Sequence, residues 1–292
     1  MNYQEFLHNI KIAIGTQIDS TCTVDVQPIK KNNGTVLDGL VIINPSINIS
    51  PTIYLNPYYH RYLSGQSIND ISEDIIKTYK KVMPKKSVNI EFFKHFDQIK
   101  DSIVMRLINY DKNMELLNEI PHIRFHDLAI IFQALIFKSN EKSANITIYN
   151  SHLKLWNICI NELNKIASIN TPRLLPVDIF NMNVLLPEHL QNSYMDHDMY
   201  VVTNQSRTYG ATSILYNGVL KGIAEELNSI LIIIPSSIHE VLVFPSYSDY
   251  IDESLNQFIK EVNSTSVLDS EVLSDHAYYY SLKSDIVNVQ FK

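Results

Sequence analysis

Short apolar runs of strand length alternate with amphipathic stretches of helical spacing through residues 127 to 244, and this alternation restricts the chain to a mixed α/β fold. The run Ile230–Ile234 ends at Pro235 and is followed, after a polar turn, by the run Val241–Phe244. Apolar runs this short, bounded by Pro and Ser, are typical of strands. We therefore predict the order β-β-α-β-α-β-β for this half, with its strands in one sheet and helices packed on it.

The other segments predict three regions. Residues 1–120 read as an α+β region, because helical spacing in Tyr3–Ile14 gives way to strand-like alternation in Thr21–Gln27 and to a hairpin turn at Asn33 and Gly34. Residues 121–247 form the α/β sheet domain, and residues 248–292 a helix and an irregular tail packed on the body. The segment before residue 121 lacks the Gly/Ser richness of a flexible linker, so the halves are expected to pack together.

Charge and targeting signals exclude several classes of protein. A formal net charge of -7 disfavours nucleic-acid binding, which normally requires a basic surface. The longest apolar run, Ile230–Ile234, is far shorter than the roughly 20 residues that span a bilayer, so no membrane helix is expected. Residues 1–6 lack the features of a secretory signal, and Cys22 and Cys159 have no CxxC partner. These observations predict a cytoplasmic protein.

The candidate catalytic residues are Ser237, His239 and Glu240. A serine beside a histidine and a carboxylate can supply a nucleophile, a base and an acid that orients the base. Ser237 and His239 are close neighbours in a tight strand connection that lacks a Gly-x-Ser-x-Gly elbow. A polar turn between two strands is the favoured interpretation, on the turn preferences of Pro and Ser.

The segment Asn204–Gly210 joins a strand to a helix and is the preferred candidate for ligand binding. Ligands in open α/β sheets bind at the carboxyl ends of strands, and backbone N–H groups in such a loop can hold an anion with help from Arg207. The segment has one glycine, so it matches neither the dinucleotide nor the P-loop pattern. The alternative is an ordinary helix start in which Gly210 permits close packing. No cofactor is predicted.

His122 and His126 are the candidate metal ligands. On a helix, residues four apart share one face, and Asp127 would add a carboxylate. Pro121 precedes them and a strand-like run follows, and on a strand the same spacing separates the side chains by about 13 Å, too far to share one ion. The strand interpretation is favoured, and no metal site is predicted.

A cluster of tyrosines near the start of the chain has two interpretations. Tyr54, Tyr58, Tyr59 and Tyr62 lie on and before a short helix beside Arg61. Tyrosine and arginine are enriched at binding surfaces, which suggests a partner site. Tyrosine is also commonly half-buried with its hydroxyl in solvent, and core packing is the favoured interpretation.

Several motifs spread over nearly the whole chain carry a resemblance to known sequences. They are Arg106–Tyr110, Asn170–Arg173, Met199–Asn204, Tyr209–Thr212, the helical stretch Leu215–Leu227, Ile234–Val241 and Leu273–His276. Together they resemble a family of bacterial proteins catalogued as a domain of unknown function. More remotely, the order of elements is similar to the YtpQ family, in which a Thr-Pro pair and a strand ending in Thr-Asn recur. The resemblance implies an intracellular α/β protein and supplies no catalytic role.

The leading hypothesis is a non-catalytic binding or interaction protein with an unknown protein or small-molecule partner. It follows from the missing acid–base or nucleophile constellation and from the aromatic clusters. The alternative is a hydrolase or transferase whose site is assembled from separated residues around the 236–240 turn and the 204–210 loop.

Overall fold

The chain divides into two compact units, Met1–Glu91 and Phe92–Lys292. The computed structural model describes residues 1–83, 91–139, 142–182, 199–246 and 253–289. The sequence analysis placed the boundary near residue 120, whereas β4 (Ile103–Asn109) pairs along its whole length with β6 (Leu128–Ser139) in the second unit. The boundary therefore falls before this strand pair, because a sheet cannot be divided between two independently packed cores.

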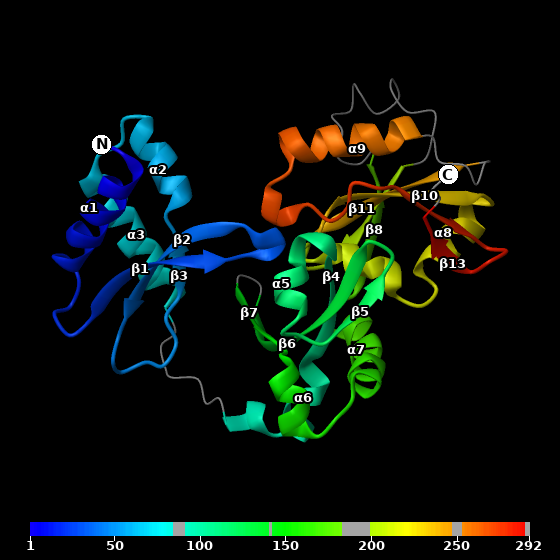
Figure 1. Cartoon of the computed structure of the whole chain (residues 1–292), viewed down its shortest axis with the longest axis horizontal. Helices are drawn as coiled ribbons and strands as arrows, with labels where there is room; N and C mark the ends of the chain where they lie inside the picture. Colours follow the sequence, from blue (N-terminus) through cyan, green and yellow to red (C-terminus); the bar gives the residue numbers. More distant parts are fainter. Residues whose placement is uncertain (84–90, 140–141, 183–198, 247–252, 290–292) are drawn as a thin grey trace. The chain divides into compact units, whose positions relative to one another are not determined.

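The first unit packs helices against an antiparallel sheet of strand order β1-β2-β3 (Figure 1). Its core joins one stripe of each long helix to alternate strand positions, so that Phe6 and Ile10 meet Leu40, Ile42 and Ile75. The elements are α1 (Tyr3–Gly15), β1 (Thr23–Lys30), β2 (Val36–Ile43), β3 (Thr52–Tyr54), α2 (Asn56–Leu63) and α3 (Ile68–Val82). The predicted hairpin is confirmed, with Asn33 at φ 58° and Gly34 at φ 68° in its turn.

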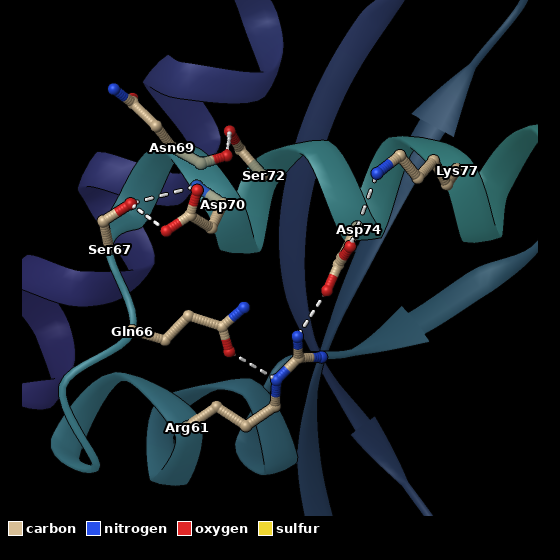
Figure 2. Close-up of polar contacts among 8 residues, drawn as sticks. All are labelled: Arg61, Gln66, Ser67, Asn69, Asp70, Ser72, Asp74 and Lys77. Atoms are coloured by element: carbon tan, nitrogen blue, oxygen red, sulfur yellow. Dashed lines mark hydrogen bonds and ion pairs between the residues drawn. The ribbon is translucent and has the colours of Figure 1, made fainter.

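Side-chain bonds fix the α2–α3 connection (Figure 2). Ser67 caps α3, since its hydroxyl accepts the backbone N–H of Asp70 at 3.1 Å. The guanidinium of Arg61 on α2 donates to Gln66 at 2.8 Å and forms an ion pair with Asp74 on α3. This hydrogen-bonded partner lowers the pKa of the Asp74 carboxyl. Because both side chains of this ion pair are half exposed, the pair adds little to the free energy of unfolding, and its main effect is to orient α2 relative to α3.

The tyrosine cluster packs on the core of the first unit. The ring centroid of Phe6 lies 5.2 Å from that of Tyr59 and 5.6 Å from that of Tyr62. Tyr58 receives the Arg61 guanidinium on its ring at 5.1 Å. These contacts support the packing interpretation over a partner surface.

The second unit contains two antiparallel sheets in its described part. We call them the β4 sheet, with order β4-β6-β5 and β7 paired to β6, and the β10 sheet, with order β13-β12-β10-β11-β9-β8. Their remaining strands are β5 (His122–Phe125), β7 (Lys142–Thr147), β8 (Val177–Asn181), β9 (Tyr200–Asn204), β10 (Ile230–Ser237), β11 (Glu240–Ser246), β12 (Tyr278–Ser281) and β13 (Ile286–Asn288).

Helices cover both faces of the β10 sheet (Figure 1). On one face α8 packs Ile223 in a core with Ile233, and on the other α9 packs Ile259 against Ile232. The α-helices are α4 (Phe96–Ile99), α5 (Met114–Leu117), α6 (Asn150–Trp156), α7 (Ile160–Leu174), α8 (Val219–Leu227) and α9 (Glu253–Ser266), and the 3-10 turns include η3 (Lys100–Ser102), η6 (Gly210–Leu215) and η7 (Asp269–Glu271). Within the described ranges, no helix combines the length and apolarity needed to cross a membrane.

The mixed α/β class is confirmed, with helices packed on antiparallel sheets, but the strands are grouped differently from the prediction. We expected the strands of residues 127 to 244 in one sheet, whereas β6 and β7 belong to the β4 sheet and β9 to β11 to the β10 sheet. Helical spacing also continues through residues 150–166 and 211–227, but the structure interrupts both segments. Asn157 ends α6 at φ 52°, and Gly218, at φ 81°, separates η6 from α8. Left-handed residues break a helix even where the apolar spacing continues.

One core joins the two sheets through the buried edge of β4. Met105 and Leu107 on this strand pack in the same cluster as Leu231 and Ile233 of β10. The backbone N–H of Met105 donates to Thr171 Oγ1 at 2.9 Å, and that of Leu107 to Thr212 Oγ1 at 3.0 Å. Buried backbone donors must be paired, so these threonines replace a missing neighbouring strand.

Replacing Thr212 by valine is expected to destabilise the second unit by about 1–3 kcal/mol, because the buried N–H of Leu107 loses its acceptor while the shape is kept. Thr212→Ser is the control, since it keeps the hydroxyl. Urea unfolding followed by the fluorescence of Trp156, the chain's single tryptophan, measures both variants. Equal stability of the valine variant and the wild type would show that this hydrogen bond does not hold the edge.

Candidate functional site

The structure brings the two candidate segments of the sequence, Asn204–Gly210 and the 236–240 turn, into contact. The hydroxyl of Thr203 donates to the backbone carbonyl of His239 at 2.7 Å. A Cβ atom on Gly210 would lie 2.1 Å from Thr203 Oγ1 and 2.4 Å from the same carbonyl. Gly210 therefore allows the close approach that the packing interpretation required, and the loop after β9 rests directly on the β10–β11 turn.

Asn204 organises the loop from within. Its side-chain Oδ1 accepts the backbone N–H of Ser206 at 3.0 Å, and its Nδ2 donates to the Thr208 carbonyl at 3.0 Å. The N–H of Arg207 donates to the Asn204 carbonyl at 2.8 Å. These N–H groups are engaged inside the loop, so the backbone cradle expected there for an anion is not formed by them.

His239 is held by two partners far from it in sequence. Its Nδ1 accepts the backbone N–H of Tyr209 at 3.2 Å, and its Nε2 lies 3.5 Å from Glu271 Oε1 on η7. The ring therefore connects the loop, the turn and η7. Glu271, rather than the predicted Glu240, is the carboxylate beside the imidazole.

Ser237 does not bond to the imidazole. Its hydroxyl accepts the backbone N–H of His239 at 3.0 Å, which closes the β10–β11 turn, and the residue is 8% exposed. Glu240 pairs with Ser237 across the hairpin as the first residue of β11. In this arrangement the three candidate catalytic residues build a turn and do not form a nucleophile–base pair.

Arg207 points its charge away from the buried part of the loop. Its guanidinium lies 3.8 Å from Asp178 Oδ2 and 5.2 Å from the Phe180 ring, both on β8, and its side chain is 63% exposed. An exposed ion pair of this kind contributes little energy. The cation expected to assist a ligand in this loop is therefore already paired at the surface.

A different arginine lies beneath the loop. Arg106 on β4 is 2% exposed, and its guanidinium carbon lies 4.9 Å from the centroid of the Tyr209 ring. Nε donates to Gln133 Oε1 and Nη1 to the Thr208 carbonyl, each at 3.4 Å. We call Arg106, Asn204–Gly210, Ser237–Glu240 and Glu271 together the loop–turn site.

The charge of Arg106 has no acidic partner in the part of the chain that the structure describes. Burial lowers the pKa of the guanidinium to about 10, which leaves it protonated at pH 7. An unpaired buried ion costs several kcal/mol even after relaxation. A desolvated cation–π contact returns about 2 kcal/mol, and hydrogen bonds as long as 3.4 Å are weak. The contacts around Arg106 thus leave its charge incompletely compensated.

The candidate metal ligands are held separately. His122 on β5 bonds through Nδ1 to the Ile120 carbonyl at 3.1 Å, and His126 bonds through Nε2 to the Val287 carbonyl at 2.9 Å. A ring nitrogen that faces a carbonyl must carry a proton, so neither of these nitrogens offers a lone pair to a metal. No group of three or more His, Cys, Asp or Glu residues suited to a metal ion occurs among the described residues.

The sequence carried a signal for Arg106 but none for Glu271. A single cation within the apolar run Ile103–Ile108 is unusual on a buried strand, and that pattern identifies Arg106 as a residue with a specific role. Glu271 lies far along the chain from His239, in a short turn with no periodic pattern. Only the packing of η7 beside the β10–β11 turn, with the Ile238 N–H donating to the Glu271 carbonyl at 2.8 Å, brings them together.

Comparison with known proteins yields one family. A family described as "Family of unknown function (DUF5688)" matches residues 3–282. Comparisons with curated proteins and with solved structures find no match. The match covers both units and includes every residue of the loop–turn site.

The contact at Gly210 predicts opposite effects for two glycine-to-alanine changes. Gly210→Ala forces a Cβ against backbone and is expected to destabilise the second unit by about 3 kcal/mol. Gly222→Ala, on the exposed side of α8 with nothing within 4 Å, is the matched control and is expected to stabilise by about 0.5–1 kcal/mol. Trp156 fluorescence during urea unfolding compares them. A neutral Gly210→Ala would contradict the close approach of loop and turn.

Proposed function

We propose that this chain, which belongs to the DUF5688 family, is a non-catalytic binding protein that holds its partner at the loop–turn site. The observation that carries the proposal is the buried guanidinium of Arg106 beneath Tyr209, at the carboxyl end of β9. A few convergent polar groups are what fixes a ligand's orientation in a binding site.

The positions of the other site residues support binding over catalysis. The Ser237 hydroxyl serves the backbone of the turn, and His239 Nδ1 serves the backbone of the loop. A serine nucleophile requires a base within hydrogen-bond reach of its hydroxyl, and here the imidazole is directed at Tyr209 and Glu271 instead. These residues therefore provide a fixed scaffold for a partner.

The alternative is a hydrolase or transferase, and one contact favours it. His239 and Glu271, with Nε2 3.5 Å from Oε1, resemble the base and the orienting acid of a catalytic pair. Ser237 is engaged in the turn, so such an enzyme would activate water or a substrate hydroxyl directly. His239 could take that proton only after the Tyr209 N–H releases Nδ1, because Nε2 faces Glu271.

The proposed setting is the bacterial cytoplasm. The support is the resemblance of the sequence motifs to bacterial proteins and the remote similarity to the YtpQ family. The net charge of -7 favours a protein or small-molecule partner over nucleic acid, and we propose no membrane partner.

Turnover assays separate the two functions. With p-nitrophenyl acetate and p-nitrophenyl phosphate, the wild type is expected to hydrolyse neither substrate faster than His239→Gln does, because no nucleophile–base pair is assembled. Saturable turnover that falls at least about a hundredfold in His239→Gln would establish the enzyme and remove the non-catalytic proposal. Ser237→Ala then shows whether the serine takes part.

Binding is measured separately by native mass spectrometry after incubation with the small-molecule fraction of a bacterial lysate. The wild type is expected to retain a compound that Tyr209→Ala loses, because the Tyr209 ring contacts both the Arg106 guanidinium and the His239 ring. Tyr149→Ala, which changes an exposed tyrosine outside the site, is the control and keeps the compound. Retention that is equal in all three proteins would place binding elsewhere.

A further inference from the structure

We infer that the ligand of the loop–turn site is a small molecule that carries an oxyanion, a carboxylate or a phosphate, and that this group pairs with the guanidinium of Arg106. The inference rests on the proposed function and specifies its ligand class. It starts from an imbalance of charge inside the second unit and not from the exposed cations of its surface.

The acids of the site, Glu240 and Glu271, form no ion pair with Arg106 in the described part of the chain. Glu271 faces His239 Nε2 at 3.5 Å, and Asp178 faces the exposed Arg207 at 3.8 Å. Neither forms an ion pair with Arg106. The described residues supply Arg106 with an amide oxygen, a backbone carbonyl and an aromatic ring, and none of these carries a negative charge at neutral pH.

The donors on the edge of the guanidinium are the part of Arg106 that the described residues engage least. The Tyr209 ring occupies its face, with the guanidinium carbon 4.9 Å from the ring centroid. Nε and Nη1 each make one long hydrogen bond, and the described residues give Nη2 no acceptor. A planar fork of N–H donors with its face already covered matches the two oxygens of a carboxylate or phosphate, which bind along the edge.

Other ligand classes fit less well. A cation is repelled by the buried charge, and a neutral ligand leaves that charge unpaired. Chloride is a single acceptor atom, whereas the guanidinium edge presents parallel N–H donors that suit two oxygens. Because Arg106 is 2% exposed, pairing there is screened by salt far less than adsorption of an anion to surface lysines. Selectivity for oxyanions over chloride at equal ionic strength therefore distinguishes this site from a charged surface.

Thermal unfolding and isothermal titration of the full chain test the inference. Phosphate, pyrophosphate, succinate and citrate are compared with sodium chloride at equal ionic strength. At least one oxyanion is expected to bind with one-to-one stoichiometry and to raise the Tm of the second unit by about 5 °C at ~100 times its Kd, where chloride does not. The phosphate and carboxylate arms show which oxyanion the site prefers.

Three variants test whether oxyanion binding depends on Arg106. Arg106→Met is expected to weaken binding at least about a hundredfold, because the charge and the donors are both lost. Arg106→Lys keeps the charge without the fork and is expected to lose about tenfold. Arg124→Gln, which changes an exposed arginine of β5 outside the loop–turn site, is the control and stays within about twofold. Circular dichroism establishes that each variant folds, and Arg106→Lys carries the test if Arg106→Met does not.

Several results would overturn the inference. They are a Tm that responds to oxyanions no more than to chloride, a response that does not saturate, or equal affinity in wild type and Arg106→Lys. Loss of binding in Arg124→Gln alone would also overturn it. If the compound retained in native mass spectrometry is neutral or cationic and still depends on Tyr209, the proposed binding function stands and only the oxyanion assignment fails. If neither assay finds a ligand, both fail.

Discussion

The buried edge of β4 is the constraint on which the second unit depends. Its outward N–H groups lie away from water and without a neighbouring strand, so acceptors must come from side chains. Thr171 on α7 and Thr212 on η6 supply them at 2.9 and 3.0 Å. Because η6 follows the loop after β9 directly, anchoring Thr212 also anchors that loop. The Thr212 hydroxyl thus ties β4 to the segment after β9, and the Thr171 hydroxyl ties β4 to α7.

The position of Arg106 follows from the same edge. It lies between Met105 and Leu107, whose N–H groups the threonines accept, and its side chain meets Thr208 and the Tyr209 ring of the anchored loop. Gly210 then lets the loop rest on the β10–β11 turn, where His239 bonds to Tyr209. A packing requirement at one strand thus produces a buried cation beneath a fixed loop, the kind of arrangement that specific recognition uses.

Local sequence patterns predicted the positions of helices and strands better than they predicted which strands pair in one sheet. Alternation and turn residues identified the first hairpin and the two strands joined by the 236–240 turn. The division of strands between two sheets depends on contacts between distant residues, which no local pattern encodes.

At the site, the sequence identified both segments that meet but paired His239 with Glu240, its neighbour in the chain. The packing of η7, which brings Glu271 to the imidazole, has no sequence signature. Arg106, the cation in the apolar run of β4, is a signal that the sequence does carry, because charged residues are rarely fully buried.

The most direct measurement of this account is a crystal structure of the full chain grown with phosphate or citrate as an additive. The account predicts Arg106 buried beneath Tyr209, Thr171 and Thr212 on the β4 edge, and an oxyanion about 3 Å from the guanidinium nitrogens. A guanidinium paired instead with a carboxylate of the chain itself, or extended into solvent, would contradict it.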